Sequence, residues 1–186
     1  DIRVERLISI KELSKLQSIG GSFRVYDGSF TSFEGLENLT SIEGDLEING
    51  YINNLESFKG LSGLQSIGGS FKLITTINNL VSFEGLENLT SIKGNFEIKP
   101  MNSLYGAFNA LVSFKGLENL VNIGGNFEIN ANFEGLGALA SFEGSENLAS
   151  IGGNFEINAE GFYTLSVLAS FEGLENLENI GGNFEI

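Results

Sequence analysis

The sequence predicts an all-β fold with short helical or 3₁₀ turns, namely a right-handed parallel β-solenoid of seven coils. Three observations lead to this prediction. One short motif recurs along the chain, apolar residues recur at fixed positions of the motif, and glycine occupies another fixed position. The clearest copy runs over residues 80–98. A self-similar unit of about 20–50 residues is typical of solenoids, in which each coil buries its apolar side chains against its neighbours.

The repeats extend over residues 1–186, and we therefore expect a single repeat domain. The seven coils are centred on Ile10, Phe33, Phe58, Phe83, Phe114, Phe142 and Phe171. A second aromatic position recurs at Phe23, Leu46, Phe71, Phe96, Phe127, Phe155 and Phe184. These two columns contain 12 of the 16 phenylalanines, so we expect stacked aromatic rings inside the solenoid.

Each repeat divides into short elements. Residues 95–98 alternate polar and apolar, which is typical of a half-buried strand. Residues 80–83 suggest a second short extended segment. Leu86 and Leu89 lie three residues apart after Gly85, a spacing that suits a 3₁₀ or single helical turn. Equivalent strands should stack in parallel about 4.8 Å apart, with right-handed crossovers.

Each repeat has glycine two residues after the Ile92 position, often as the second residue of a Gly-Gly pair. This column holds Gly21, Gly44, Gly69, Gly94, Gly125, Gly153 and Gly182. A backbone corner with positive φ, or close contact between coils, explains such a column.

Composition excludes several functions. The net charge of −14 argues against nucleic-acid binding, which needs clustered Lys and Arg. The chain has no Cys, so it has neither disulfides nor thiolate metal sites, and it contains no apolar run long enough to insert into a membrane. The chain also has no His. The usual general base and the thiol nucleophile are therefore both missing, and we expect neither enzymatic activity nor a cofactor. A glycosidase would need two unique facing carboxylates, whereas the glutamates here belong to the repeat.

Charged residues form two columns. The outward strand position carries Glu47, Glu97, Glu128, Glu156 and Glu185, joined by Arg24 and Lys72. We interpret it as a solvated sheet face and keep a weak cation site at Glu97, Glu128 and Glu156 as the alternative. The other column alternates in sign over six copies: Lys11, Glu34, Lys59, Glu84, Lys115, Glu143, and then Glu172. We expect it to fix the register between coils.

An asparagine column precedes the second leucine of the turn, at Asn38, Asn88, Asn119, Asn147 and Asn176. We expect these amides to satisfy backbone groups of the turns. Asn38 and Asn88 also begin formal glycosylation sequons, and their modification is the less favoured interpretation.

The segments between the main strand and the next coil vary in length, and the longest cover residues 99–110, 130–138 and 158–167. Insertions of this kind in solenoids map to one edge, which is often the binding edge. We name as candidate ligand-binding residues Tyr51, Met101, Tyr105, Phe133, Phe162 and Tyr163. The alternative is that such aromatic side chains pack under their own loops.

Blocks such as Gly-Leu-Glu-Asn-Leu followed by Ile-Gly-Gly-Asn-Phe-Glu-Ile resemble the receptor L-domain type of leucine-rich β-solenoid, in the form found in bacterial and fungal surface proteins. The resemblance covers essentially the whole chain. It implies an extracellular or cell-surface protein whose role is adhesion, binding of a protein or glycan, or wall structure. We therefore expect a non-catalytic binding module, with a structural or self-assembling element as the alternative.

The last copy stops at Ile186, directly after the main strand. A solenoid needs a cap because its last coil otherwise exposes apolar side chains and a strand edge. We therefore expect a longer polypeptide, or a second molecule that covers this end.

Overall fold

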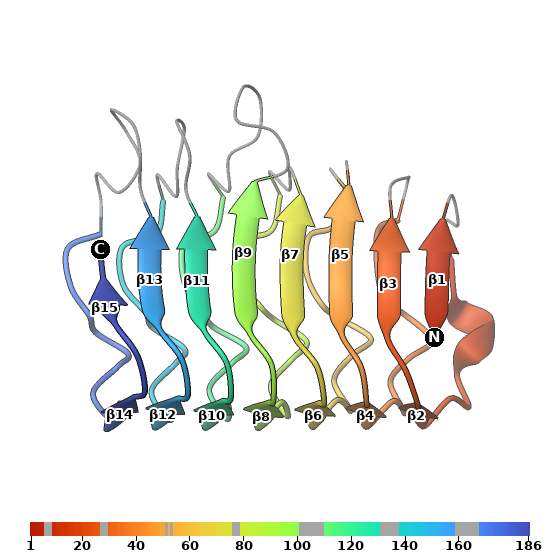
Figure 1. Ribbon diagram of the computed structural model, residues 1–186. Coiled ribbons are helices and arrows are strands. Elements are labelled where there is room, and N and C mark those ends of the chain that lie inside the picture. The colour runs from red at the N-terminus through yellow and green to blue at the C-terminus, as the bar shows by residue number, and fades with distance from the viewer. Residues whose placement is uncertain are drawn as a thin grey trace.

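The structure is a computed structural model that describes residues 1–5, 9–26, 30–50, 52, 54–75, 79–100, 110–130, 138–158 and 168–186. It is a parallel β-solenoid with almost no helix, as the sequence predicts. Figure 1 shows the strands side by side along the solenoid axis, from β1 near the N-terminus to β15 near the C-terminus.

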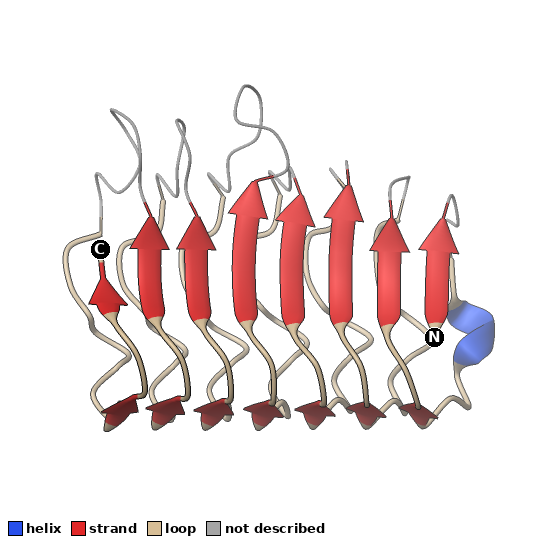
Figure 2. Cartoon of the chain, viewed as in Figure 1, coloured by secondary structure: helices blue, strands red, loops and turns tan. Residues whose placement is uncertain are grey.

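Two parallel sheets run along the axis in the part of the chain that the structure describes. Sheet A has eight strands: β1 (Ile2–Glu5), β3 (Phe23–Tyr26), β5 (Leu46–Gly50), β7 (Phe71–Thr75), β9 (Phe96–Pro100), β11 (Phe127–Asn130), β13 (Phe155–Asn158) and β15 (Phe184–Glu185). Sheet B has seven two-residue strands: β2 (Ser18–Ile19), β4 (Ser41–Ile42), β6 (Ser66–Ile67), β8 (Ser91–Ile92), β10 (Asn122–Ile123), β12 (Ser150–Ile151) and β14 (Asn179–Ile180). Figure 2 shows the two sheets joined by loops, with the short helix η1 (Lys11–Leu13) near the N-terminus.

Neighbouring coils pair in register, so each sequence column becomes a row of contacts. In sheet A, Phe127 lies opposite Phe96 on one side and Phe155 on the other. In sheet B, Ile123 pairs with Ile92 and Ile151 in the same way. Each predicted repeat therefore contributes one strand to each sheet, and β1 adds an eighth strand to sheet A alone.

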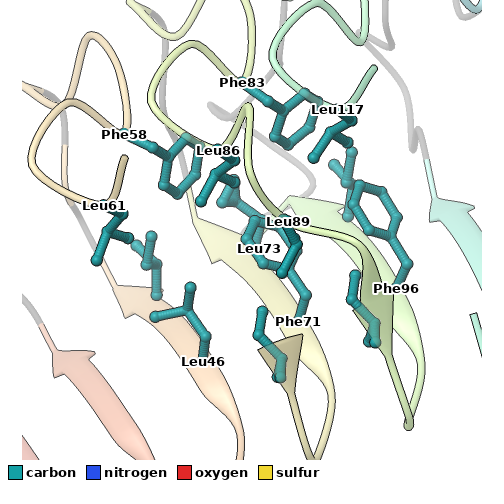
Figure 3. Packing of buried hydrophobic residues seen from close by; sticks show 14 of the residues in the cluster. Leu46, Phe58, Leu61, Phe71, Leu73, Phe83, Leu86, Leu89, Phe96 and Leu117 are labelled. Carbon is teal, nitrogen blue, oxygen red and sulfur yellow. The ribbon is translucent and has the colours of Figure 1, made fainter. Parts of the chain in front are cut away.

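The core is made of the predicted columns. Rings in the Phe96 column stack almost parallel, with centroids 5.1 Å apart for Phe96–Phe127 and 5.0 Å apart for Phe127–Phe155. Rings in the other aromatic column, at the corner of the coil, also stack, as for Phe83 and Phe114 at 5.5 Å. Figure 3 shows both kinds of phenylalanine pointing toward one another, with leucines between them. The predicted aromatic interior is confirmed.

The corner that follows the Phe83 column in each coil is built from two consecutive tight turns. The N–H of Leu86 donates to the Phe83 carbonyl at 3.1 Å, and the N–H of Leu89 donates to the Leu86 carbonyl at 2.9 Å. This is the 3₁₀-type pattern that the spacing predicts, and in the first coil it is regular enough to form η1.

Of the two explanations for the Gly94 column, close contact between coils is confirmed, because a Cβ at Gly94 would lie 2.7 Å from the Gly69 carbonyl carbon of the preceding coil. The positive φ angles lie at other glycines, most of them at the corner, as at Gly85 (φ 107°). One local prediction needs correction. The second sheet is formed by the Ser91–Ile92 column, whereas residues 80–83 form no strand.

Candidate functional site

The outer face of sheet A, which we define by the outward charged column from Arg3 to Glu185, changes character along the axis. Its outward side chains alternate with buried ones, as in the burial pattern of β11. Adjacent strands place equivalent members side by side, as for Glu97, Glu128 and Glu156.

Near the N-terminal end of this face, opposite charges compensate each other. Arg24 lies 3.2 Å from the Glu47 carboxylate, 3.5 Å from Asp45 and 3.8 Å from Asp1. Lys72 lies 4.0 Å from Asp45. These groups are partly exposed, so they stabilise the fold only modestly but leave little net charge on this part of the face.

Toward the C-terminal end, asparagine amides take the place of cations. The amide of Asn126 donates to Glu128 at 2.7 Å, Asn154 donates to Glu156 at 2.6 Å, and Asn183 donates to Glu185 at 3.0 Å. Among the described residues, no group of three or more His, Cys, Asp or Glu side chains is placed so that it could hold a metal ion. The weak cation site at Glu97, Glu128 and Glu156 therefore gains no support, and two of these carboxylates, Glu128 and Glu156, already accept asparagine amides.

A polar spine that the sequence analysis missed lies beside this face. The residue before each sheet-A strand accepts, through its side-chain oxygen, the backbone N–H of the same position in the next coil. The donor–acceptor distances are 2.6–3.0 Å for the successive acceptors Asp1, Ser22, Asp45, Ser70, Asn95, Asn126 and Asn154. The signal in the sequence is that this position always holds a small side chain with an oxygen acceptor. The spine connects every coil to the next and is structural.

The asparagine column of the turns is structural as well. The amide of Asn38 donates to the Ser14 carbonyl of the preceding coil at 2.7 Å, and that of Asn88 donates to the Ser62 carbonyl at 2.7 Å. The predicted role of these amides is confirmed. Glycosylation of Asn38 or Asn88 would modify the nitrogen that makes this bond.

The glutamate two residues after the corner glycine acts as a cap. Its carboxylate accepts the glycine N–H, as Glu37 does from Gly35 at 2.9 Å and Glu175 from Gly173 at 3.0 Å. These hydrogen bonds lower the pKa of Glu37 and the pKa of Glu175 below the ordinary carboxyl value, because they favour the charged form.

The alternating column forms ion pairs between coils. Lys59 lies 3.1 Å from Glu84, and Lys11 pairs with Glu34 at 2.5 Å. The hydrogen bond to Glu34 raises the pKa of Lys11 above its ordinary value. A shallow groove of about 490 Å³ lies beside the Lys59–Glu84 pair and is lined also by Ser57, Ser82 and Val81. An equivalent groove accompanies the Lys11–Glu34 pair, so the groove is a feature of the repeat and not a unique site.

All six candidate ligand-binding residues lie outside the described residues: Tyr51, Met101, Tyr105, Phe133, Phe162 and Tyr163. The structure does show where the segments that carry them attach. Each begins at the carboxyl end of a sheet-A strand, such as β9 (Phe96–Pro100) or β11 (Phe127–Asn130). Because these strands are parallel neighbours, their carboxyl ends lie along one edge of sheet A (Figure 1).

No protein family, curated protein or solved structure matches this chain significantly. The parallel β-solenoid is therefore what the structure establishes, and the resemblance to the receptor L-domain type remains a prediction. Among the described residues, no helix is long and apolar enough to cross a membrane.

Proposed function

We propose that this protein is a non-catalytic binding module that recognises a protein or glycan through the edge at the carboxyl ends of the sheet-A strands. The observation that supports this proposal is the contrast between a constant framework and variable connections. β7 and β9 pair in register up to Thr75 and Pro100, yet the connection to the next corner has quite different lengths in these two coils. A scaffold that keeps its core constant and varies one edge is suited to recognition.

The absence of catalysis is part of the same proposal. The chain contains no His and no Cys. Several described carboxylates occupy repeated positions with fixed hydrogen-bond donors, such as Glu128, which accepts from the Asn126 amide, and Glu146, which accepts from the Gly144 N–H. A location outside the cell or on its surface, which the resemblance implies, also belongs to the proposal and is tested by protease accessibility on intact cells of the source organism.

A loop exchange tests the binding edge. Residues 101–109 are replaced by residues 76–78, which join the same framework positions one coil earlier, between Thr75 and Asn79. The probes are an array of plant, fungal and bacterial wall oligosaccharides and a panel of immobilised glycoproteins. We expect saturable binding to at least one probe, lost in the loop exchange and weakened in Tyr105→Ala and Tyr163→Ala, with little change in melting temperature.

The matched control is the double substitution Glu128→Ala and Glu156→Ala on the outer face of sheet A, which should leave binding unchanged. Two results would reject the proposed edge: the absence of saturable binding to any probe, or binding that survives the loop exchange and is lost in the control.

A further inference from the structure

Two shallow grooves occupy equivalent places on the side of the solenoid that leads from each sheet-A strand to the next sheet-B strand. The groove beside the Lys59–Glu84 pair spans the third and fourth coils and has a volume of about 490 Å³. The groove beside the Lys11–Glu34 pair spans the first and second coils and has a volume of about 450 Å³. Equivalent points of the two grooves are therefore two coils apart, which is about 9–10 Å at the spacing of parallel strands.

Both grooves offer hydroxyl groups at regular intervals beside the ion pair. The Ser57 hydroxyl oxygen accepts the Lys59 N–H at 3.4 Å, and that of Ser82 accepts the Glu84 N–H at 3.4 Å. The serines of the other groove make equivalent bonds. Such a bond uses only the hydroxyl oxygen, so the hydroxyl hydrogen of each serine remains a donor for a ligand.

The wall opposite the ion pairs becomes apolar along the axis. It carries Thr31 in one groove, and Glu56 and Val81 in the other. Val81 is 49% exposed, and the equivalent residue of the next coil, Val112, is 43% exposed. The Val112 N–H donates to the Val81 carbonyl at 3.0 Å, which holds the two side chains in one row. The grooves therefore combine a few fixed polar groups with exposed methyl groups, as ligand sites do.

The charges that line the grooves disfavour an anionic ligand. Lys11 and Glu34 cancel each other in one groove, and Lys59 is accompanied by two glutamates, Glu56 and Glu84, in the other. Each of these lysines is already paired with a glutamate of the next coil. The net charge of the whole chain, −14, adds to the repulsion of an anion. A neutral ligand therefore fits these grooves best.

We propose that a neutral, extended β-1,4-linked glycan lies along this side of the solenoid, with one sugar opposite each coil. Alternate sugars of such a chain are turned over, so the same sugar face recurs at every second sugar, a distance close to that between the two grooves. The ion pairs and serine hydroxyls bind sugar hydroxyls, and Val81 contacts the C–H face of a ring. Each groove then makes equivalent contacts with the glycan.

The grooves adjoin the proposed binding edge. Asn79, which lines the groove beside Lys59, directly follows residues 76–78, and Ala110 of the next coil directly follows residues 101–109. A glycan in the groove therefore passes the points at which the variable segments return to the framework. This inference rests on the proposed binding role and names the ligand class, but the residues that carry it belong to the constant framework.

Oligosaccharides of defined length and linkage test the match between sugars and coils. The probes are cellobiose, cellohexaose, chitohexaose and maltohexaose, and isothermal titration calorimetry measures their affinity for the chain of residues 1–186. At least one β-1,4-linked hexasaccharide should bind about tenfold or more tightly than cellobiose, because its contact with the second groove is intramolecular. Maltohexaose should bind about tenfold or more weakly than that hexasaccharide, because its α-1,4 bonds curve the chain away from the second groove.

A matched pair of variants tests the groove itself. Lys59→Ala with Glu84→Ala removes one ion pair without changing the net charge, and exposed pairs contribute little to stability. The affinity for the hexasaccharide should fall about tenfold, toward that of the disaccharide, because one groove is lost. The control is Glu43→Ala with Lys93→Ala, two exposed residues directly after the sheet-B strands β4 and β8. It should leave the affinity unchanged, and both variants should melt close to the parent chain.

The results separate this inference from the proposed edge. The glycan assignment is overturned if neither β-1,4-linked hexasaccharide binds, if maltohexaose binds as tightly, or if the groove variant and its control bind alike. Binding that is lost on exchange of residues 101–109 but complete in Lys59→Ala with Glu84→Ala would reject the groove and keep the edge. Saturable binding to a glycoprotein without binding to either hexasaccharide would do the same.

Discussion

Removal of a ring from the middle of the Phe96 column should be far more costly than removal of the ring at its end. Phe127 is 2% exposed and lies between Phe96 and Phe155 at centroid distances of 5.1 and 5.0 Å. It also contacts Phe114 and Phe142 of the other column at 5.8 and 6.2 Å. Neighbouring coils are held at the spacing of the sheet, so they cannot collapse into the cavity. We expect Phe127→Ala to lower the free energy of unfolding by about 3–5 kcal/mol.

The control is in the same column. Phe184 is 52% exposed and stacks on one sheet-A ring only, Phe155 at 4.9 Å. Phe184→Ala should therefore cost about 1 kcal/mol, roughly half of the transfer energy of a buried Phe side chain. Urea denaturation followed by circular dichroism measures both values, at a concentration where the chain is monomeric. Equal losses for the two variants, or a loss below about 1 kcal/mol for Phe127→Ala, would refute the reasoning from column packing.

Three further predictions concern single positions. Gly85→Ala should destabilise the protein by more than about 2 kcal/mol, because φ is positive at Gly85 and a Cβ there would overlap the Phe58 backbone. Gly20 has open space around it, so the control Gly20→Ala should have little effect on the urea midpoint. Thr75→Val should stabilise the protein by about 1 kcal/mol in thermal melts, because Thr75 is fully buried and its hydroxyl has no hydrogen-bond partner among the described residues. The pKa of Glu37 is lowered in the folded state. Its carboxylate therefore stabilises the fold fully above the ordinary carboxyl pKa, and this stabilisation is lost as the pH falls through the lowered pKa. The urea midpoints of Glu37→Gln and the parent chain should differ at neutral pH and converge in acid.

Much of the fold could be predicted because equivalent residues of successive repeats stack on one another. A position that recurs in the sequence therefore becomes a column in the structure. Alternation over residues 95–98 is a strong strand signal, and the strand in the structure, Phe96–Pro100, overlaps it. Sheet B could not be found in this way, because a two-residue strand such as Ser91–Ile92 is too short to show a period. The extended appearance of residues 80–83 came from packing, since Leu80 and Phe83 are buried at a corner and not paired in a sheet.

The glycine columns show a different limit. An invariant glycine indicates that a Cβ is not tolerated, but the sequence does not separate positive φ from contact with a neighbouring coil. The structure assigns positive φ to Gly85 and close contact to Gly94. The polar spine was missed because its members differ chemically (Asp45, Ser70 and Asn95 among them) and share only an acceptor oxygen at a suitable distance. The candidate binding residues, such as Tyr105, lie outside the described residues, so that prediction remains untested.

The apolar columns hold the coils together but do not specify which coil follows which. Phe83, Phe114 and Phe142 are interchangeable in the core, so a slip of one coil would preserve most of the buried area. The polar spine does not resolve this ambiguity either, because every coil offers both a backbone donor and a side-chain acceptor. The alternating charges do distinguish neighbours, since a slip of one coil would replace the contact between Lys59 and Glu84 with a pair of like charges. Each exposed pair contributes only a few tenths of a kcal/mol, and the ion pairs of this column join Lys11 to Glu34 and Lys59 to Glu84. Because a slip of one coil costs the apolar core little, even these weak charges favour the native register.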